Sequence, residues 1–328
     1  MTRLLLPILS LLVAGLFAAS LLIGPAGLSP VESLAALIRG DRLAETLVMR
    51  EIRLPRALLA VLVGAALGLA GAAMQGYLRN PLAEPGLIGV SGSTALGAVL
   101  ALQTGFAGAY LFALPLAALA GAVVAVLLIL MLAGARGGSI TLILAGIAVS
   151  ALAGALTSLV LNLSPNPFAA SEIVFWMMGS LVDRSMDHVL LAAPFIALGA
   201  LVLLTQARAL DALTLGEDAA ASMGVHLARL RLLLVLGVAS MVGAATAVAG
   251  AIGFVGLVVP HVLRPLVGAR PSALLPASAI GGAALVLMAD IAVRLILPER
   301  DLKLGVLTAL VGAPLFLHLI YKTRAQGL

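Results

Sequence analysis

Few residues in this sequence have the types and spacing that bond-making chemistry requires. The four histidines are dispersed along the chain: His188, His226, His261 and His318. They lack the spacing of metal ligands, and the absence of cysteine excludes thiolate nucleophiles and iron–sulfur ligation. Neither Lys303 nor Lys322 belongs to a glycine-rich phosphate loop, so we expect no ATP site. The sequence therefore predicts no catalytic residue, no metal site and no cofactor bound by this chain.

The longest polar segment, 206–231, has the signals of a short helix. Thr214 and Glu217 have the spacing of a capping box, in which each side chain bonds to the other's backbone amide. Gly224 can then end the helix in a left-handed conformation. We expect a capped helix of about two turns here. On spacing alone, a solvated loop remains the alternative.

The composition indicates that most of the chain lies in lipid. Hydrophobic residues make up 62% of it and charged residues only 10%, against about 25% charged in ordinary soluble domains. Its 35 glycines and 4% aromatics are typical of helices that pack closely through small side chains. We interpret the net charge of +5 as arginines at helix ends and loops, and not as a nucleic-acid surface.

Counting the apolar intervals between charges predicts an all-α polytopic membrane protein with ten spans. The intervals are 4–23, 57–78, two within 85–135, one within 137–171, 189–207, two within 232–263, 271–289 and 304–321. Glycines and Pro260 interrupt 232–263, and the lone Trp176 suggests a short interfacial helix over 172–181. A cleaved signal peptide is the alternative for the first interval. We treat 1–328 as a single transmembrane domain.

The orientation and an internal repeat follow from the same count. An even number of spans places both termini on one side, and the arginine-rich short loops on that side favour the cytoplasm. Residues 63–72 and 242–251 are identical at seven of ten positions, and Leu78 and Pro81 match Leu257 and Pro260 at the same offset. The first copy descends while the second ascends, which predicts an inverted repeat.

Several segments resemble the FecCD family of binding-protein-dependent permeases. The loop 79–86 contains two prolines and a glycine, so it must turn outside lipid. This loop looks like one of the signatures of that family. The other segments that look like its signatures are 53–56, Gln75, 144–149, 176–181, 215–225, 250–268 and 305–320. The resemblance implies a type II ABC importer permease fold, a homodimer, two cytoplasmic ATP-binding subunits that use ATP-Mg, and a periplasmic binding protein.

The resemblance also implies roles for particular residues. The segment 215–225 looks like the coupling helix that seats in the ATPase, with Leu215, Gly216, Glu217, Asp218, Met223 and Gly224 as its positions. Arg53 and Arg294 resemble the arginines that pair with glutamates of the binding protein; snorkelling to lipid headgroups is the alternative. Asn80, Leu82 and Ser139 look like the inner gate, with loop packing as the alternative.

The cargo and the energy source leave alternatives open. The family imports ferric siderophores, haem and cobalamin; we expect a ferric siderophore or haem first and cobalamin second. An ion-driven secondary transporter would need carboxylates within its spans. Asp290 is the only near candidate, but it lies four residues before Arg294, so a helical ion pair explains it more simply. A membrane-embedded enzyme or structural subunit is a further alternative.

Overall fold

The computed structural model describes residues 2–24, 27–38, 41, 43–110, 112–134, 138–164, 167–296 and 302–325. These residues form helices joined by loops, and no strand occurs among them. The long helices and the apolar helices of the bundle are α1 (Thr2–Leu22), α4 (Leu54–Tyr77), α5 (Val90–Gln103), α6 (Ala113–Ala133), α7 (Ser139–Asn162), α9 (Met186–Thr205), α12 (Leu227–Ala249), α13 (Val255–Leu263), α14 (Pro271–Ile296) and α15 (Leu304–Ala325). The short elements are α2 (Pro30–Ile38), α3 (Ala44–Leu47), η1 (Val48–Arg53), η2 (Pro85–Ile88), η3 (Phe106–Gly108), α8 (Pro167–Met177), α10 (Ala207–Leu213), α11 (Glu217–Ser222) and η4 (Arg264–Val267).

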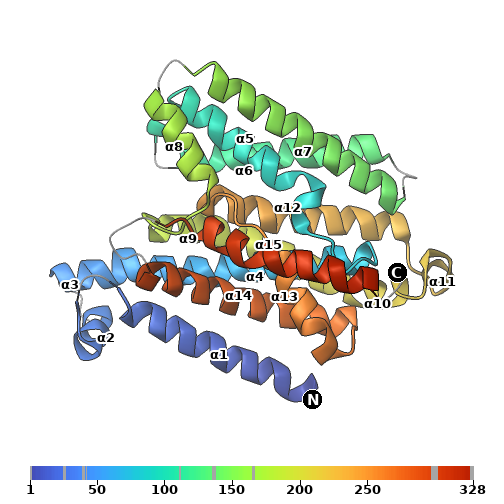
Figure 1. The fold of residues 1–328 in the computed structure, drawn as a ribbon, viewed down its shortest axis with the longest axis horizontal. Helices are drawn as coiled ribbons and strands as arrows, with labels where there is room; N and C mark the ends of the chain where they lie inside the picture. Colours follow the sequence, from blue (N-terminus) through green and yellow to red (C-terminus); the bar gives the residue numbers. More distant parts are fainter. Residues whose placement is uncertain are drawn as a thin grey trace.

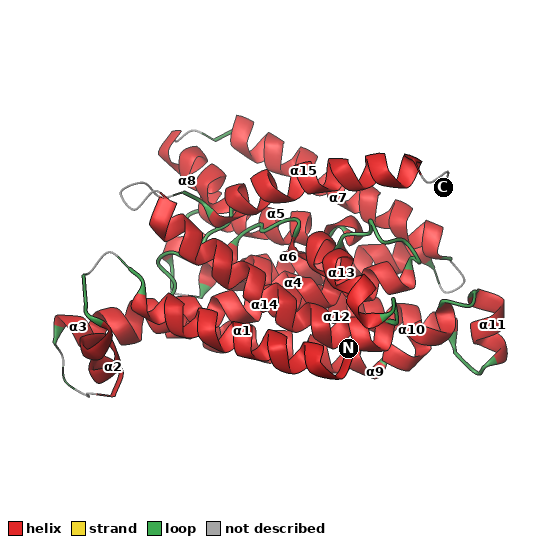
Figure 2. Ribbon diagram, turned by 60° about the horizontal axis from the view of Figure 1, so that its bottom comes forward, coloured by secondary structure: helices red, strands yellow, loops and turns green. Residues whose placement is uncertain are grey.

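The helices make ten passages through the bundle, in agreement with the sequence. Seven stretches, which contain α1, α4, α6, α7, α9, α12 and α14, are long and apolar enough to cross a membrane. Four shorter apolar stretches lie in α5, in α8, in α13 with η4, and in α15; all but the one in α8 continue the alternation and complete the ten. Successive passages alternate in direction, so α1 begins and α15 ends at the same end of the bundle (Figure 1). We call this the terminal end; α10 and α11 lie there, whereas α2, α3 and α8 lie at the opposite end (Figures 1 and 2).

Two predicted boundaries were wrong. The second span does not start at Ala57, because Ala44–Tyr77 is one helical stretch that includes the π-helix η1. The charged residues before Ala57 end the apolar interval, but they lie on a helix that continues beyond it. The short helix around Trp176 is α8, which begins earlier than predicted and ends before Gly179, where φ is +75°.

The inverted repeat is visible as two helices that run in opposite directions. Residues 63–72 lie in α4, and 242–251 lie in α12 and the two residues that follow it. α4 runs toward the terminal end and α12 runs away from it (Figure 1). In the apolar stretches of α4 and α12, 78% of the residues are buried inside the protein, against 17% in α1. The repeated helices therefore form the centre of the bundle.

Small residues allow the central helices to touch backbone to backbone. Gly64 and Gly68 of α4 face Gly282 and Ser278 of α14: a Cβ atom on Gly64 would lie 2.3 Å from the Gly282 carbonyl oxygen. A Cβ atom on Gly68 would lie 2.0 Å from the Ser278 carbonyl oxygen. This is the close approach that the high glycine content predicted.

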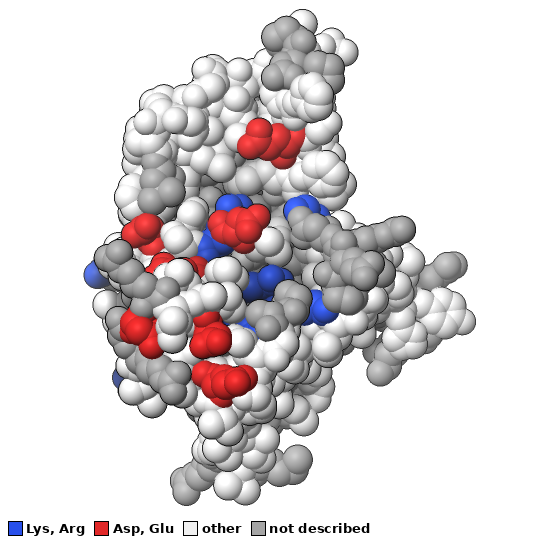
Figure 3. Space-filling model, turned by 90° about the vertical axis from the view of Figure 1, so that its left-hand side faces the viewer, with Lys and Arg blue, Asp and Glu red and all other residues white. Residues whose placement is uncertain are grey.

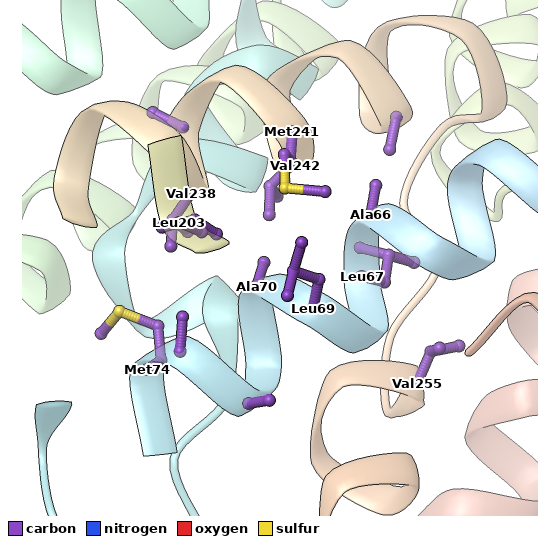
Figure 4. Close-up of a cluster of buried hydrophobic side chains, with 14 of the residues drawn as sticks. Ala66, Leu67, Leu69, Ala70, Met74, Leu203, Val238, Met241, Val242 and Val255 are labelled. Atoms are coloured by element: carbon purple, nitrogen blue, oxygen red, sulfur yellow. The ribbon is translucent and has the colours of Figure 1, made fainter. Parts of the chain in front are cut away.

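Apolar side chains fill the remaining space between the central helices. Leu69 and Met74 of α4 lie near Val238 and Met241 of α12, with Leu203 of α9 beside them (Figure 4). Each of these side chains is at most 2% exposed. α4 is thereby held between α12 and α14, and its two ends position the loops in which the candidate functional residues lie.

Candidate functional site

α11 and its flanking residues form an exposed projection at the terminal end (Figure 2). Gly216 precedes the helix with φ +110°, a conformation that disfavours other residues. Glu217 and Asp218 are exposed in the first turn, where the positive end of the helix dipole favours acidic side chains. Leu215 and Met223, on either side of α11, are 68% and 63% exposed. The projection therefore combines two acids with two uncovered apolar side chains, a surface suited to a protein partner.

The predicted capping box at Thr214 and Glu217 was wrong, although the predicted end of the helix is confirmed. Thr214 is the last residue of the turn that closes α10, so its hydroxyl donates to the carbonyl of Asp211 (2.7 Å). Gly224 has φ +87°, and its amide donates to the carbonyl of Ala221 (2.9 Å). α11 therefore ends in a left-handed glycine, as expected, but begins at a glycine and not at a side-chain cap.

One carboxylate ties this projection to the bundle. Asp211 of α10 accepts a hydrogen bond from the amide of Ser272, in the first turn of α14 (2.8 Å). Leu210, Leu213 and Ala220 are at most 1% exposed, so α10 and α11 are also anchored by apolar contacts. α11 is therefore connected to the start of α14 through α10, which contacts both helices.

A non-helical break separates α12 from α13 inside the bundle. Gly250 and Phe254 both have positive φ, +72° and +67°. The carboxylate of Glu84, in the loop after α4, accepts a hydrogen bond from the amide of Phe254 (2.9 Å). Glu84 thus supplies a negative charge at the start of α13, where amides lack helical partners. This bond joins the loop 78–89 to the break. It also gives the amide of Phe254 a hydrogen-bond acceptor, which lipid could not supply.

The buried side-chain amide of Gln75 makes a second connection between the end of α4 and α13. Gln75, which is 1% exposed, donates from Nε2 to the carbonyl of Leu257 (3.3 Å). Its Oε1 accepts a hydrogen bond from Nη2 of Arg264 (2.7 Å). The end of α4, the following loop and α13 with η4 are therefore held together by polar side chains.

The three predicted gate residues all belong to loops or helix starts at the terminal end. Asn80 is exposed, and its Oδ1 accepts a hydrogen bond from the amide of Leu82 (2.9 Å), which is half-buried. Ser139 is the first residue of α7; its side chain lies outside the described residues. The turn at Asn80 is explained by loop geometry, and a gating role for the three residues stays a prediction.

Arg53 and Arg294 lie close together at the opposite end, where both bind the last turn of α1. Arg53 Nη1 donates to the carbonyl of Leu21 (2.9 Å), and Arg294 Nη1 donates to the carbonyl of Ser20 (2.8 Å). Cations are favoured at the negative end of a helix, so these bonds hold α1 against η1 and α14. Arg53 is only 3% exposed, although its Nη2 has no hydrogen-bond partner in the described residues. Docking of a binding protein at these arginines stays a prediction.

The predicted ion pair between Asp290 and Arg294 is confirmed, and the structure adds a second cation. Asp290 is 1% exposed and bonds to Arg294 within α14 and to Nη2 of Arg56 (2.8 Å). Both carboxylate oxygens of Asp290 are bound by guanidinium groups, so a structural ion-pair cluster explains this residue without a proton relay. Figure 3 shows this end of the molecule, with Lys and Arg atoms near its middle and Asp and Glu atoms around them.

Sequence reasoning missed the residues whose partners are distant along the chain. Glu84 lies in a segment that carried the family resemblance, but its partner Phe254 is 170 residues away. Arg56 is 234 residues from Asp290. A carboxylate in a proline-rich loop between two apolar spans is a signal for such a partner, but it cannot identify which amide the carboxylate binds. In the described residues, no three His, Asp or Glu side chains are placed to hold a metal ion.

The fold and these sites define a multi-pass membrane permease. Its passages alternate through one bundle, one passage is broken, and a short exposed helix projects from the end where the chain starts and finishes. The chain belongs to the FecCD transport family, whose sequence pattern matches residues 11–322.

Relatives and a solved structure agree with this membership. The chain is 39% identical over 287 residues to the hemin transport system permease protein HmuU of Yersinia pestis, covering 84% of this chain and 83% of the relative. It is 39% identical over 317 residues to the vitamin B12 import system permease protein BtuC of Salmonella typhi, covering 96% and 94%. A solved inward-facing structure of a metal-chelate type ABC transporter matches with a TM-score of 0.86 and 36% identity, covering 97% of this chain and 98% of that one.

Proposed function

We propose that this chain, as a homodimer, forms the path through which an ATP-driven importer moves a metal chelate across the cytoplasmic membrane of a bacterium. The observation that carries the proposal is the exposed helix α11, which carries two uncovered acids and packs on α10, the helix that Asp211 bonds to α14. Relatives named for hemin, ferric dicitrate and vitamin B12 support a chelate as cargo. A ferric siderophore or haem is the first choice and cobalamin the alternative.

In this proposal the energy comes from partner proteins. Two cytoplasmic ATP-binding subunits hydrolyse ATP-Mg, and the segment 206–231 transmits their closure to the helices of the single domain 1–328. The terminal end, with both termini, then faces the cytoplasm, and the opposite end receives a periplasmic binding protein. The chain itself needs no cofactor and catalyses no reaction.

Reversing the two acids of α11 tests this proposal. We expect the double variant E217K/D218K to bind its ATP-binding subunit about 100-fold more weakly, because like charges then oppose each other across the contact. Copurification of the two subunits from membranes measures the effect. The matched control is E45K/E51K, which reverses two exposed acids at the opposite end and should leave copurification unchanged. Equal loss in both variants, or in neither, would refute the role of α11.

We also propose that the face containing Arg53 and Arg294 binds the periplasmic partner. The support is the family resemblance of the two arginines and the grouping of basic atoms at this end in Figure 3. We expect R53Q to slow association with the binding protein by roughly tenfold at low salt, with a smaller salt dependence than the wild type, because steering charges act mainly on the association rate. If Arg53 serves only as a cap for α1, R53Q will lower thermal stability and leave the salt dependence of association unchanged.

An ion-driven secondary transporter gains no support from the described residues. Such a carrier needs a carboxylate that changes its charge within the spans. Asp290, the only candidate from the sequence, is occupied by two guanidinium groups.

A further inference from the structure

A basic pocket lies at the terminal end between the end of α9, α10 and the start of α12. Its volume is about 770 Å³. Arg208 of α10 contributes one cation to its lining, and Arg229 of α12 contributes another, with His226 beside it. Val202 and Leu233 lie about one helical turn deeper than the polar residues of α9 and α12, so the lining changes from basic to apolar toward the bundle centre.

The two arginines of this pocket have no counterion in the described part of the chain. Both are exposed, and neither forms an ion pair or a side-chain hydrogen bond with a described residue. None of the described residues that line the pocket is acidic. The carboxylate of Asp211, one turn from Arg208, is already bound to the amide of Ser272. The pocket therefore has two cations, on two different helices, and no acidic side chain among its described lining residues.

α9 and α12 also carry exposed apolar side chains within two turns of the pocket. Leu201 and Leu204 of α9 are 63% and 43% exposed, and Leu232 and Leu236 of α12 are 42% and 43% exposed. A soluble anion would use only the basic residues, whereas a phospholipid would use both surfaces at once: its headgroup on the arginines and its acyl chains on the leucines.

We propose that this pocket binds the phosphate headgroup of an anionic phospholipid. Phosphate matches the planar, permanently charged guanidinium groups of Arg208 and Arg229. Basic pockets between transmembrane helices at the cytoplasmic side are known to hold such headgroups. Because the two arginines belong to α10 and α12, the bound headgroup bridges both sides of α11 and fastens the coupling projection at the level of the membrane surface.

The test uses the purified full chain in phosphatidylcholine nanodiscs to which phosphatidylglycerol is added, with bound lipid counted by native mass spectrometry. We expect the wild type to retain phosphatidylglycerol in preference to phosphatidylcholine. The double variant R208Q/R229Q should retain it about 30-fold more weakly, which corresponds to about 1 kcal/mol for each arginine. Each single variant should show about a fivefold loss, by the same constant. R208K/R229K keeps both charges but loses the planar guanidinium groups, so it should bind phosphatidylglycerol more tightly than R208Q/R229Q and more weakly than the wild type.

The control is R270Q, which removes an exposed arginine at the same end that does not line the pocket. It should bind phosphatidylglycerol as the wild type does. A parallel titration with inorganic phosphate separates the two sources of the anion: displacement of phosphatidylglycerol by phosphate alone would overturn the lipid assignment. Unchanged phosphatidylglycerol retention in R208Q/R229Q, or equal loss in R270Q, would overturn the site itself. If the double variant unfolds, the single variants decide by the same criteria.

Discussion

Replacing Asp290 with alanine is expected to lower the free energy of unfolding by about 3–5 kcal/mol, because it leaves two cations without their shared counterion. Asp290 is 1% exposed, and Arg294, which bonds to it, has a side chain that is only 6% exposed. Arg56 also bonds to Asp290, so both guanidinium groups lose their anionic partner together. Thermal unfolding of the purified protein in detergent measures the effect.

Glu51 provides the control for Asp290. It is an exposed acid at the same end, in η1, and E51A should change stability by less than about 0.5 kcal/mol. The variant D290N also separates two interpretations of this residue. If Asp290 were a proton relay, D290N would keep its stability and lose transport; we expect it to lose stability, because a neutral amide cannot compensate two cations. Equal melting temperatures for D290A and E51A would contradict the account.

Replacing Gly68 with alanine is expected to destabilise the bundle by about 3 kcal/mol or more. In an unconstrained helix the same change would stabilise by up to about 1 kcal/mol. Here the new methyl group would lie 2.0 Å from the carbonyl oxygen of Ser278, which is backbone of α14 and cannot rotate away. α4 and α14 must therefore separate, and the packing of both helices is lost along their length.

Gly76 is the matched control on the same helix. The nearest atoms to a Cβ at Gly76 are side-chain carbons at 3.7 Å, which is an ordinary contact distance. G76A should therefore be neutral or slightly stabilising in the same thermal unfolding assay. If G68A melts at the temperature of G76A, the backbone contact between α4 and α14 does not exist as described.

The sequence was sufficient to predict the passages but not all of their boundaries. Lipid requires long apolar runs, so nearly every helix of the bundle appears as an interval between charges. That rule fails where a charged segment stays helical outside the apolar core, as in η1. Charged residues indicate where the chain leaves the lipid, and a helix can continue beyond that point. The same rule also missed α10, since a short helix of mixed composition has no strong periodic signal.

Helix caps show the limit of local spacing rules. A capping box forms at Ser29 and Glu32, where the Ser29 amide donates to the Glu32 carboxylate (2.9 Å) and the Glu32 amide to the Ser29 hydroxyl (3.3 Å). The backbone amide of Ser29, and after it the Ser29 side chain, lower the pKa of Glu32. The same spacing at Thr214 and Glu217 gives no capping box, because the Thr214 hydroxyl bonds to the carbonyl of Asp211 at the end of α10. Where two helices adjoin, the end of one and the start of the next compete for the same capping side chain. Residue spacing alone does not predict which helix the side chain caps.

The features of the candidate functional sites that depend on local sequence could be predicted, whereas those that depend on distant residues could not. The exposed acids of α11 and the glycine that ends it are local features, and the sequence located them. The bonds from Glu84 to Phe254, from Arg264 to Gln75 and from Arg56 to Asp290 join residues that come together only when α4, α13 and α14 pack. Their partners follow from the fold, so they could not have been assigned before it.

Uptake by reconstituted vesicles tests most directly whether this chain is a conduit driven by a partner's ATP hydrolysis. The chain is reconstituted with its ATP-binding subunit and binding protein, and the chelate that the binding protein retains is supplied at the opposite end. We predict uptake with ATP at the terminal end, none with an ion gradient alone, and little with E217K/D218K. Uptake by the chain alone under an ion gradient, without any ATP-binding subunit, would contradict the account.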